Sequence, residues 1–276
     1  MDRLSQLLRY FSISAGVFYT GNLCGLSEFD ADDDEQGHLH LLQSGQLTLV
    51  DQDGRLRHFS QPTVLFFPRP ASHKLKAHQK DNARLMCASI RYGTGCRNPL
   101  ANALPSLIAI NLSDSMALQT TTSLLFDEAS HERQGKAALM DRLAEIFVVQ
   151  LLRHALQAGL VSGGLLSGMA DPRLAAALHA IHTDPSHDWT LPELASMSSM
   201  SRSKFAEQFK SVIGLAPGEY LQEWRVAMAQ VYLKNGKPVN WVANHVGYEN
   251  GSTLSRVFRR RTGMSPTQWL QQIARD

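Results

Sequence analysis

The chain has 276 residues, of which 43% are hydrophobic and 19% are charged, and its formal net charge is +2. This length is enough for two domains with cores of their own, and the composition is that of a soluble globular protein. No apolar run approaches the roughly 18 residues of a membrane span and the first residues lack a secretory pattern, so we expect no membrane partner and a cytoplasmic location. Three cysteines, Cys24, Cys87 and Cys96, are too few for a disulfide framework and lack the spacing of a zinc site.

The first part of the chain, up to about Gly95, has the pattern of short strands separated by turns. Residues His38–Val50 alternate between apolar and polar and end at Asp51-Gln52-Asp53-Gly54, a hairpin signal. Two further strands are expected at Pro62–Phe67 and Arg84–Tyr92. Several strands at this spacing predict a small barrel or sandwich, which we place at residues 1–112.

From Ser113 the pattern becomes helical, with helices expected over Met116–Phe126 and Ala137–Ala158. In the second helix, apolar residues recur at three- and four-residue steps: Leu139, Leu143, Ile146, Phe147 and Leu151. Such a stripe packs either on its own domain or on a second copy of the chain. Residues 113–160 are therefore a candidate dimerisation segment, and the Gly- and Ser-rich residues 161–170 are the best candidate for a linker.

The remaining residues, 171–276, are expected to be helical and contain an internal duplication. Phe209-Lys210-x3-Gly214-x2-Pro217-x2-Tyr220-Leu221 recurs, 49 residues later, as Phe258-Arg259-x3-Gly263-x2-Pro266-x2-Trp269-Leu270. The whole chain is thus predicted to be α+β, with a strand-rich domain first and an all-α domain second.

The first copy of the repeat has the signals of two short helices joined by a tight turn. Thr190 and Glu193 have the spacing of a capping box, and Leu194 and Ala195 supply the apolar face of this helix. After the turn at residues 197–200, a second helix begins at the capping residue Ser201. Its expected core positions are Phe205, Phe209 and Val212; Gly214 ends it, and Pro217 opens the next helix.

The second copy repeats these signals: Pro238 starts a helix, Gly247 lies in the turn, and Asn250 is the expected cap. Each copy thus predicts a helix-turn-helix unit, whereas the alternative is merely packed amphipathic helices. Agreement between two copies favours the helix-turn-helix. Joined by one long helix, two such units could enter successive major grooves, roughly 34 Å apart, on one face of DNA.

Residues Asp171–Gln272 resemble the DNA-binding domain of the AraC/XylS family of bacterial transcription regulators. The motifs that carry the resemblance are Met200-Ser201-Arg202-Ser203, Phe209-Lys210, Val246-Gly247-Tyr248, Phe258-Arg259 and Gly263-Met264-Ser265-Pro266. The resemblance implies a sequence-specific regulator that binds double-stranded promoter DNA and works with RNA polymerase. By matching position, the DNA contacts are Arg202, Ser203, Ala206 and Glu207 in the first unit, and Ser252, Thr253 and Arg256 in the second.

The chemistry of these side chains divides their expected roles. Arg256 can bind guanine through two hydrogen bonds, and Glu207 either accepts from cytosine or is a solvated helix residue. Basic side chains on the same helices suit phosphate: Lys204, Lys210, Arg259, Arg260 and Arg261. We expect the second unit to supply more phosphate affinity and the first more base discrimination.

The strand-rich half resembles the cupin-like sensor domain of one branch of this family, over His40-x4-Gly45 to Pro68-x4-His73. Metal-binding cupins use an HxH motif, a following Glu and a later His. His38, His40 and His73 match this pattern, but Gln43 and Ser44 stand where the Glu would fall. We therefore expect no metal or cofactor. His40 and His73 are either hydrogen-bonded barrel residues or residues that line a ligand site.

The same branch contains activators that respond to reactive chlorine species through cysteines, and the matching positions here are Cys24 and Cys87. The resemblance implies redox sensing by sulfenate or disulfide formation, while the alternative is two small hydrophobic core residues. A small-molecule effector bound near His40 and His73 is the competing regulatory hypothesis. A metal-dependent cupin enzyme would need the missing Glu, and no catalytic motif occurs, so we expect no enzymatic activity.

Overall fold

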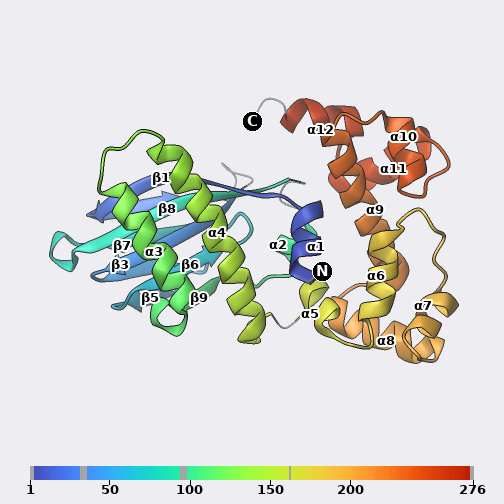
Figure 1. Cartoon of the computed structure of the whole chain (residues 1–276), viewed down its shortest axis with the longest axis horizontal. Helices are drawn as coiled ribbons and strands as arrows, with labels where there is room; N and C mark the ends of the chain where they lie inside the picture. The colour runs from blue at the N-terminus through green and yellow to red at the C-terminus, as the bar shows by residue number, and fades with distance from the viewer. Residues whose placement is uncertain (1–2, 32–35, 94–97, 162, 274–276) are drawn as a thin grey trace. The chain divides into compact units, whose positions relative to one another are not determined.

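The structure is a computed structural model that describes residues 3–31, 36–93, 98–161 and 163–273 (Figure 1). The chain divides into two compact units, one of Ser12–Val161 and one of Met1–Phe11 with Ser162–Asp276. The first unit holds the strands and the second is helical, which confirms the predicted α+β class. Cys96 lies outside the described residues. Within the described ranges, no helix is both long and apolar enough to cross a bilayer.

The strand-containing unit has two antiparallel sheets, of order β1-β8-β3-β6-β9 and β2-β7-β4-β5. The strands are β1 Ile13–Leu23, β2 Gly25–Phe29, β3 Gly37–Ser44, β4 Leu47–Val50, β5 Leu56–Phe59, β6 Thr63–Phe67, β7 His73–Ala77, β8 Ala83–Tyr92 and β9 Ile108–Asn111. Short helices interrupt them at η1 Gln79–Asp81, α2 Pro99–Asn102 and η2 Leu112–Asp114. The hairpin predicted at Asp51–Gly54 is confirmed, since β4 and β5 pair across it.

The two sheets face each other across an apolar core. One sheet supplies Leu42, Leu65 and Leu85, and the other supplies Leu49 and Leu75, all nearly fully buried. No ladder joins the two sheets among the described strands, so the domain expected as a barrel is an open pair of sheets.

The five-stranded sheet is covered on its other face by α3 Met116–Ala129 and α4 Lys136–Gln157, which lie side by side (Figure 1). Because both faces of this sheet are covered, β3 and β6 are buried along almost their whole length, including His38 and His40 of β3. Phe147 and Leu151 of the predicted α4 stripe are buried in this layer. Leu139 and Ile146 of the same stripe are 46% and 50% exposed, so only part of the stripe packs within the domain.

The helical unit contains the duplicated helices on either side of a long central helix. Its elements are α1 Arg3–Tyr10, α5 Gly164–Ala170, α6 Ala175–Thr183, α7 Leu191–Met197, α8 Arg202–Ile213, α9 Pro217–Lys234, α10 Val239–His245, α11 Gly251–Thr262 and α12 Pro266–Ile273. Helices α7 and α8 form the first helix-turn-helix copy, α10 and α11 form the second, and α9 connects them.

Most of the segment expected as a linker, residues 161–170, is helical in the structure. Gly164–Ala170 form helix α5, whose Leu165, Leu166 and Met169 are buried. A Cβ on Gly168 would lie 2.1 Å from Cδ1 of Ile213, so the absence of a side chain is what lets α5 pack on α8. Composition alone could not separate a small-residue packing surface from a linker.

The segment Arg3–Phe11 packs with the helical unit, whereas the sequence predicts a strand domain over residues 1–112. Leu7 and Phe11 are fully buried, and the Phe11 ring meets Trp224 of α9 edge to face, with ring centroids 5.3 Å apart. The core of the DNA-binding unit is therefore built from both ends of the described chain.

Candidate nucleic-acid interface and sensor residues

Both helix-turn-helix copies begin their helices as the sequence predicts. Thr190 and Glu193 form a reciprocal capping box at α7, and the Ser201 hydroxyl accepts from the Lys204 amide at the start of α8. Asn250 caps α11 through its Oδ1, which accepts from the Thr253 amide. Gly214 and Gly263 end the two second helices in the left-handed conformation.

Helix α8 buries Phe205, Phe209 and Ile213 and exposes its other residues, except for the half-buried Ala206, Gln208 and Val212. Ile213, not the predicted Val212, is the third buried position. Five of the candidate DNA contacts on α8 are exposed, and Ala206 beside them is half-buried; the exposed residues are Arg202, Ser203, Lys204, Glu207 and Lys210. One surface of the helix thus presents the whole candidate set.

Helix α11 buries Leu254 and Phe258 and exposes Ser252, Arg256, Arg259 and Arg260. Thr253 is half-buried and its hydroxyl donates to the Asn250 carboxamide at 3.2 Å, so this side chain is partly committed to the cap.

The exposed charged side chains of both helices have no hydrogen bond or ion pair with any other residue that the structure describes; they are Arg202, Lys204, Glu207, Lys210, Arg256, Arg259 and Arg260. An unpaired cation keeps its charge available to a phosphate or a base edge, because no internal partner has to be displaced.

Arg261 differs from its three neighbours on α11. Its guanidinium donates to Glu223 at 2.8 Å and to Gln222 at 3.1 Å, both on α9. Our expectation that Arg261 binds phosphate is therefore wrong for this conformation: it tethers α11 to α9. The sequence spacing indicates this inward position, because Leu254, Phe258 and Arg261 follow the i, i+4, i+7 spacing of the buried face.

In the strand domain, His40 and His73 are brought together at the core between the sheets. Their Nε2 atoms lie 2.8 Å apart, and the Nδ1 of His73 lies 2.7 Å from the Ala71 carbonyl oxygen. If His73 donates to that carbonyl, its Nε2 is the acceptor and His40 is the donor. Phe67 stacks on His73 at a centroid distance of 3.9 Å, which closes the pair within aromatic surroundings.

Burial holds both imidazoles neutral. It lowers the pKa of His40 well below its ordinary value, with His73 and His38 adding to the effect. It also lowers the pKa of His73 to about 4. Within the described residues, no group of three or more His, Cys, Asp or Glu side chains could hold a metal ion.

The two candidate redox residues occupy different environments. Cys24 is exposed just after β1, whereas Cys87 is buried in β8, where it pairs across the strands with Tyr19 on one side and His40 on the other. Burial raises the pKa of the Cys87 thiol to about 12. The thiol of Cys87 is therefore protonated at neutral pH.

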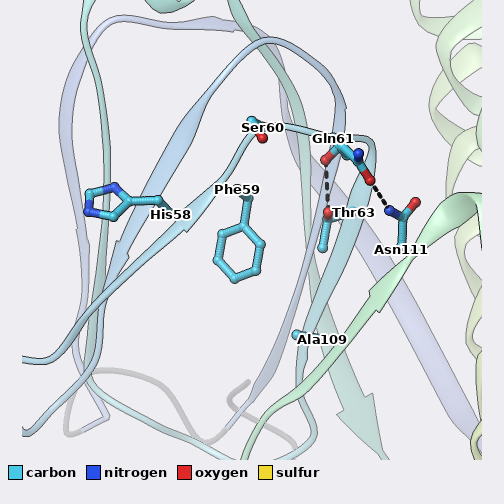
Figure 2. A pocket seen from close by; sticks show the side chains of 7 residues that line it. All are labelled: His58, Phe59, Ser60, Gln61, Thr63, Ala109 and Asn111. Carbon is cyan, nitrogen blue, oxygen red and sulfur yellow. Dashed lines mark hydrogen bonds between the residues drawn. The ribbon is translucent and has the colours of Figure 1, made fainter.

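A pocket of about 300 Å³ opens where the edge strands β5 and β9 come near each other (Figure 2). Hydrogen bonds from the Thr63 hydroxyl and the Asn111 amide both end on Gln61 (Figure 2). The lining residues are His58, Phe59, Ser60, Gln61, Thr63, Ala109 and Asn111. Neither His40 nor His73 is among them.

Comparison with known families matches both halves of the chain. Residues 2–157 match the family described as Cupin, and residues 194–272 match that described as Helix-turn-helix domain.

Three relatives span most of the sequence. An AraC-like transcription regulator of Streptomyces antibioticus is 33% identical over 204 residues, which cover 72% of this chain and 67% of the relative. An HTH-type transcriptional regulator of Haemophilus influenzae is 27% identical, covering 87% of each chain. The RCS-specific HTH-type transcriptional activator RclR of Escherichia coli is 25% identical, covering 85% of this chain and 84% of its own. The chain therefore belongs to the AraC family of DNA-binding transcription regulators, with a cupin domain before its helix-turn-helix domain.

Proposed function

We propose that the protein recognises promoter DNA by placing α8 and α11 in successive major grooves. The observation that carries this proposal is the set of exposed cations on both helices that have no partner within the described protein. The cap of each helix fixes the helix start, where side chains reach base edges most readily.

The contacts divide by chemistry. Arg256 binds guanine and Glu207 accepts from cytosine, while Arg202, Ser203 and Ser252 form the less selective contacts near each helix start. Ala206 gives an apolar contact, and Thr253 contributes least because its hydroxyl is used in the cap. Phosphate contacts come from Lys204, Lys210, Arg259 and Arg260.

The test begins with selection of operators from random duplex DNA by the full-length protein. Arg202→Ala and Arg256→Ala are then compared with Arg142→Ala, which removes an exposed arginine on α4. We expect weaker operator binding in the first two variants only. Equal binding by all three would contradict the assignment.

We further propose that the protein is an activator whose effector is an oxidant that reacts first at Cys24. The exposed Cys24 and the similarity to an RCS-specific activator support this. Hypochlorous acid would oxidise the Cys24 thiol to a sulfenic acid and be reduced to chloride, with water present as solvent. The buried, protonated Cys87 is the slower thiol because the thiolate is the reactive form.

A direct Cys24–Cys87 disulfide would require β1 to part from β8. Leu23 pairs with Ala83, so Cys24 lies one residue beyond that pair and about five residues from Cys87, roughly 17 Å along the strand. A disulfide needs Cα atoms within about 7 Å. Formation of this disulfide would thus indicate that β1 had separated from β8, whereas a sulfenate at Cys24 needs no such separation.

Cys24→Ser and Cys87→Ser separate these routes. We expect Cys24→Ser to abolish the transcriptional response to hypochlorite, and mass spectrometry of oxidised wild-type protein to show modification at Cys24 before Cys87. An unchanged response in both variants would exclude cysteine sensing.

A small metabolite is the second candidate effector, favoured by the pocket between β5 and β9 and by the buried His40–His73 pair. Nδ1 of His40 has no hydrogen-bond partner among the described residues and would accept from a donor on a ligand that enters the core. Ala109→Trp would fill the edge pocket, and His40→Leu would remove the core acceptor. Loss of metabolite-dependent induction in one variant alone would identify the site.

We infer that the protein acts in the cytoplasm, where promoter DNA and RNA polymerase are found, and that it forms a homodimer through α4. Leu139 and Ile146 on the exposed face of α4 support the dimer. Sedimentation of wild type and Ile146→Lys tests this: a monomeric wild-type protein at micromolar concentration would contradict it.

A further inference from the structure

A buried arginine lies at the meeting point of the two helix-turn-helix copies. Arg225 is halfway along α9 and only 8% exposed, although arginine rarely occupies the interior of a protein. Its side chain has partners from segments on both sides of α9.

On the side of the first copy, Arg225 holds the loop that leads into α7. Nε donates to the Pro185 carbonyl at 2.8 Å, and one terminal nitrogen donates to the His187 carbonyl at 2.9 Å. The Asp184 carboxylate shapes the same loop by accepting from the amides of Ser186 and His187. Two hydrogen bonds from a planar guanidinium fix both position and direction, which a lysine cannot reproduce.

On the side of the second copy, Arg225 contacts the turn between α10 and α11. Its guanidinium carbon is 5.6 Å from the centre of the Tyr248 ring, in a cation–π arrangement. Gly247 is closer still: a Cβ there would lie 2.7 Å from the guanidinium and 2.9 Å from the Ser186 carbonyl oxygen. The loop of the first copy and the turn of the second thus touch at this arginine.

We propose that Arg225 is the positioning residue that sets the spacing and angle between the two recognition helices. It contacts no DNA in this assignment, and it acts by holding the α6–α7 loop and the α10–α11 turn against one another. The inference rests on the proposed two-groove binding. Its consequence is that affinity for paired half-sites depends on Arg225, while affinity for one half-site does not.

The experiment compares operator spacings with the full-length protein and duplexes selected by the wild type. One duplex keeps the selected spacing, a second adds about five base pairs, which is half a helical turn, and a third carries one half-site. For wild type we expect the selected spacing to bind on the order of a hundredfold more tightly than the shifted one, because rigid linkage makes the second contact intramolecular. For Arg225→Gln, that ratio should fall about tenfold, while single half-site affinity stays within about threefold.

A destabilised domain would lose affinity for all three duplexes alike, so the ratio separates positioning from folding. Tyr220→Phe is the matched control, because it removes the hydroxyl that lies 2.6 Å from Nε2 of His182 without touching this junction. Its spacing ratio should equal that of wild type. If Arg225→Gln does not fold, Arg225→Lys and Tyr248→Leu each keep part of the junction and should lower the ratio by smaller factors.

A wild-type ratio in the folded Arg225 and Tyr248 variants would overturn the inference. Failure of the proposed function has a different signature: selection would yield no paired half-sites, or Arg202→Ala and Arg256→Ala would bind the selected duplex as wild type does.

Discussion

The two helix-turn-helix copies have the same turn geometry but place it in different surroundings. In both, the residue after the turn donates its amide to the helix before it: Met200 to Ala195 at 3.0 Å, and Tyr248 to Ala243 at 2.8 Å. The preceding residue is left-handed in both, Ser199 with φ of 52° and Gly247 with φ of 83°. Ser199 is exposed, whereas Gly247 is pressed against Arg225. The left-handed residue of the first turn is thus open to solvent, and that of the second is part of the packing that joins the copies.

Their recognition helices differ as well. The cations of α8 are interspersed with Glu207, whereas α11 exposes three arginines and withdraws the fourth, Arg261, to α9. The two copies share the same backbone arrangement but differ in the charges they expose and in how their turns pack. Each difference provides an experiment in which one copy is the control for the other.

Exchanging the turn residues should give the largest effect. Gly247→Ser adds a Cβ in a left-handed position that lacks space, and should lower the free energy of unfolding by about 3 kcal/mol. Ser199→Gly should change it by less than about 1 kcal/mol, because relief of backbone strain offsets the added freedom of the unfolded chain. Urea unfolding followed by circular dichroism measures both. Equal effects would mean that the second turn is not packed as described.

The next largest effect should come from removing one side chain from each recognition helix. Arg256→Ala should weaken binding to the selected operator by about 2 kcal/mol, roughly thirtyfold, and relax the preference at one base pair. Glu207→Ala should alter base preference in the other half-site with little loss of affinity, because a carboxylate near phosphates costs binding energy. Fluorescence anisotropy on single-base operator variants checks both. If Glu207→Ala left every preference intact, Glu207 would be a solvated helix residue.

Lowering the pH should lower the free energy of unfolding through the buried His182. His182 on α6 stacks on Trp224, and burial lowers its pKa to about 3, with His179 adding to the effect. The unfolded chain therefore binds the proton more readily, and stability is lost as pH falls below about 6.5 towards 3. Between pH 7 and pH 5 the loss should be about 2 kcal/mol.

His182→Phe keeps a ring against Trp224 and removes the titrating group. Because His40 and His73 also titrate in the other unit, the measured quantity is the difference between the pH dependences of wild type and variant in urea unfolding. Parallel curves would show that protonation of His182 does not matter to folding.

The smallest predicted effect separates two neighbouring arginines of α11. Arg259→Ala should reduce the slope of log K against log salt by about 1, since one phosphate contact is lost. Arg261→Ala should leave that slope unchanged and lower the free energy of unfolding slightly, because its partners are Glu223 and Gln222. Titrations at several salt concentrations distinguish the two; a reduced slope for Arg261→Ala would mean that the tether opens on DNA.

The features predictable from sequence are those fixed by local chemistry. Caps at Thr190, Ser201 and Asn250 and the helix ends at Gly214 and Gly263 depend on residues within one turn, so their pattern was sufficient. The helical period also gave the buried positions Phe205, Phe209, Leu254 and Phe258, but it placed Val212 where Ile213 is buried. Which exposed residues contact DNA remains a prediction.

Features set by distant partners could not be derived. Nothing near Arg225 in the sequence indicates that Pro185 and Gly247 surround it, and nothing near Phe11 points to Trp224. In the strand domain, the sequence named His40 and His73, but their direct contact depends on the meeting of β3 and β7 across the core. The Gly-rich α5 was mistaken for a linker because its partner Ile213 is equally remote.

The contact between Phe11 and Trp224 has a consequence for synthesis. Trp224 is synthesised long after Phe11, so this contact cannot form until Trp224 has left the ribosome. The strand domain has all of its described residues before Val161 and can fold first. Each nascent chain should therefore complete its strand domain before the core of its DNA-binding unit.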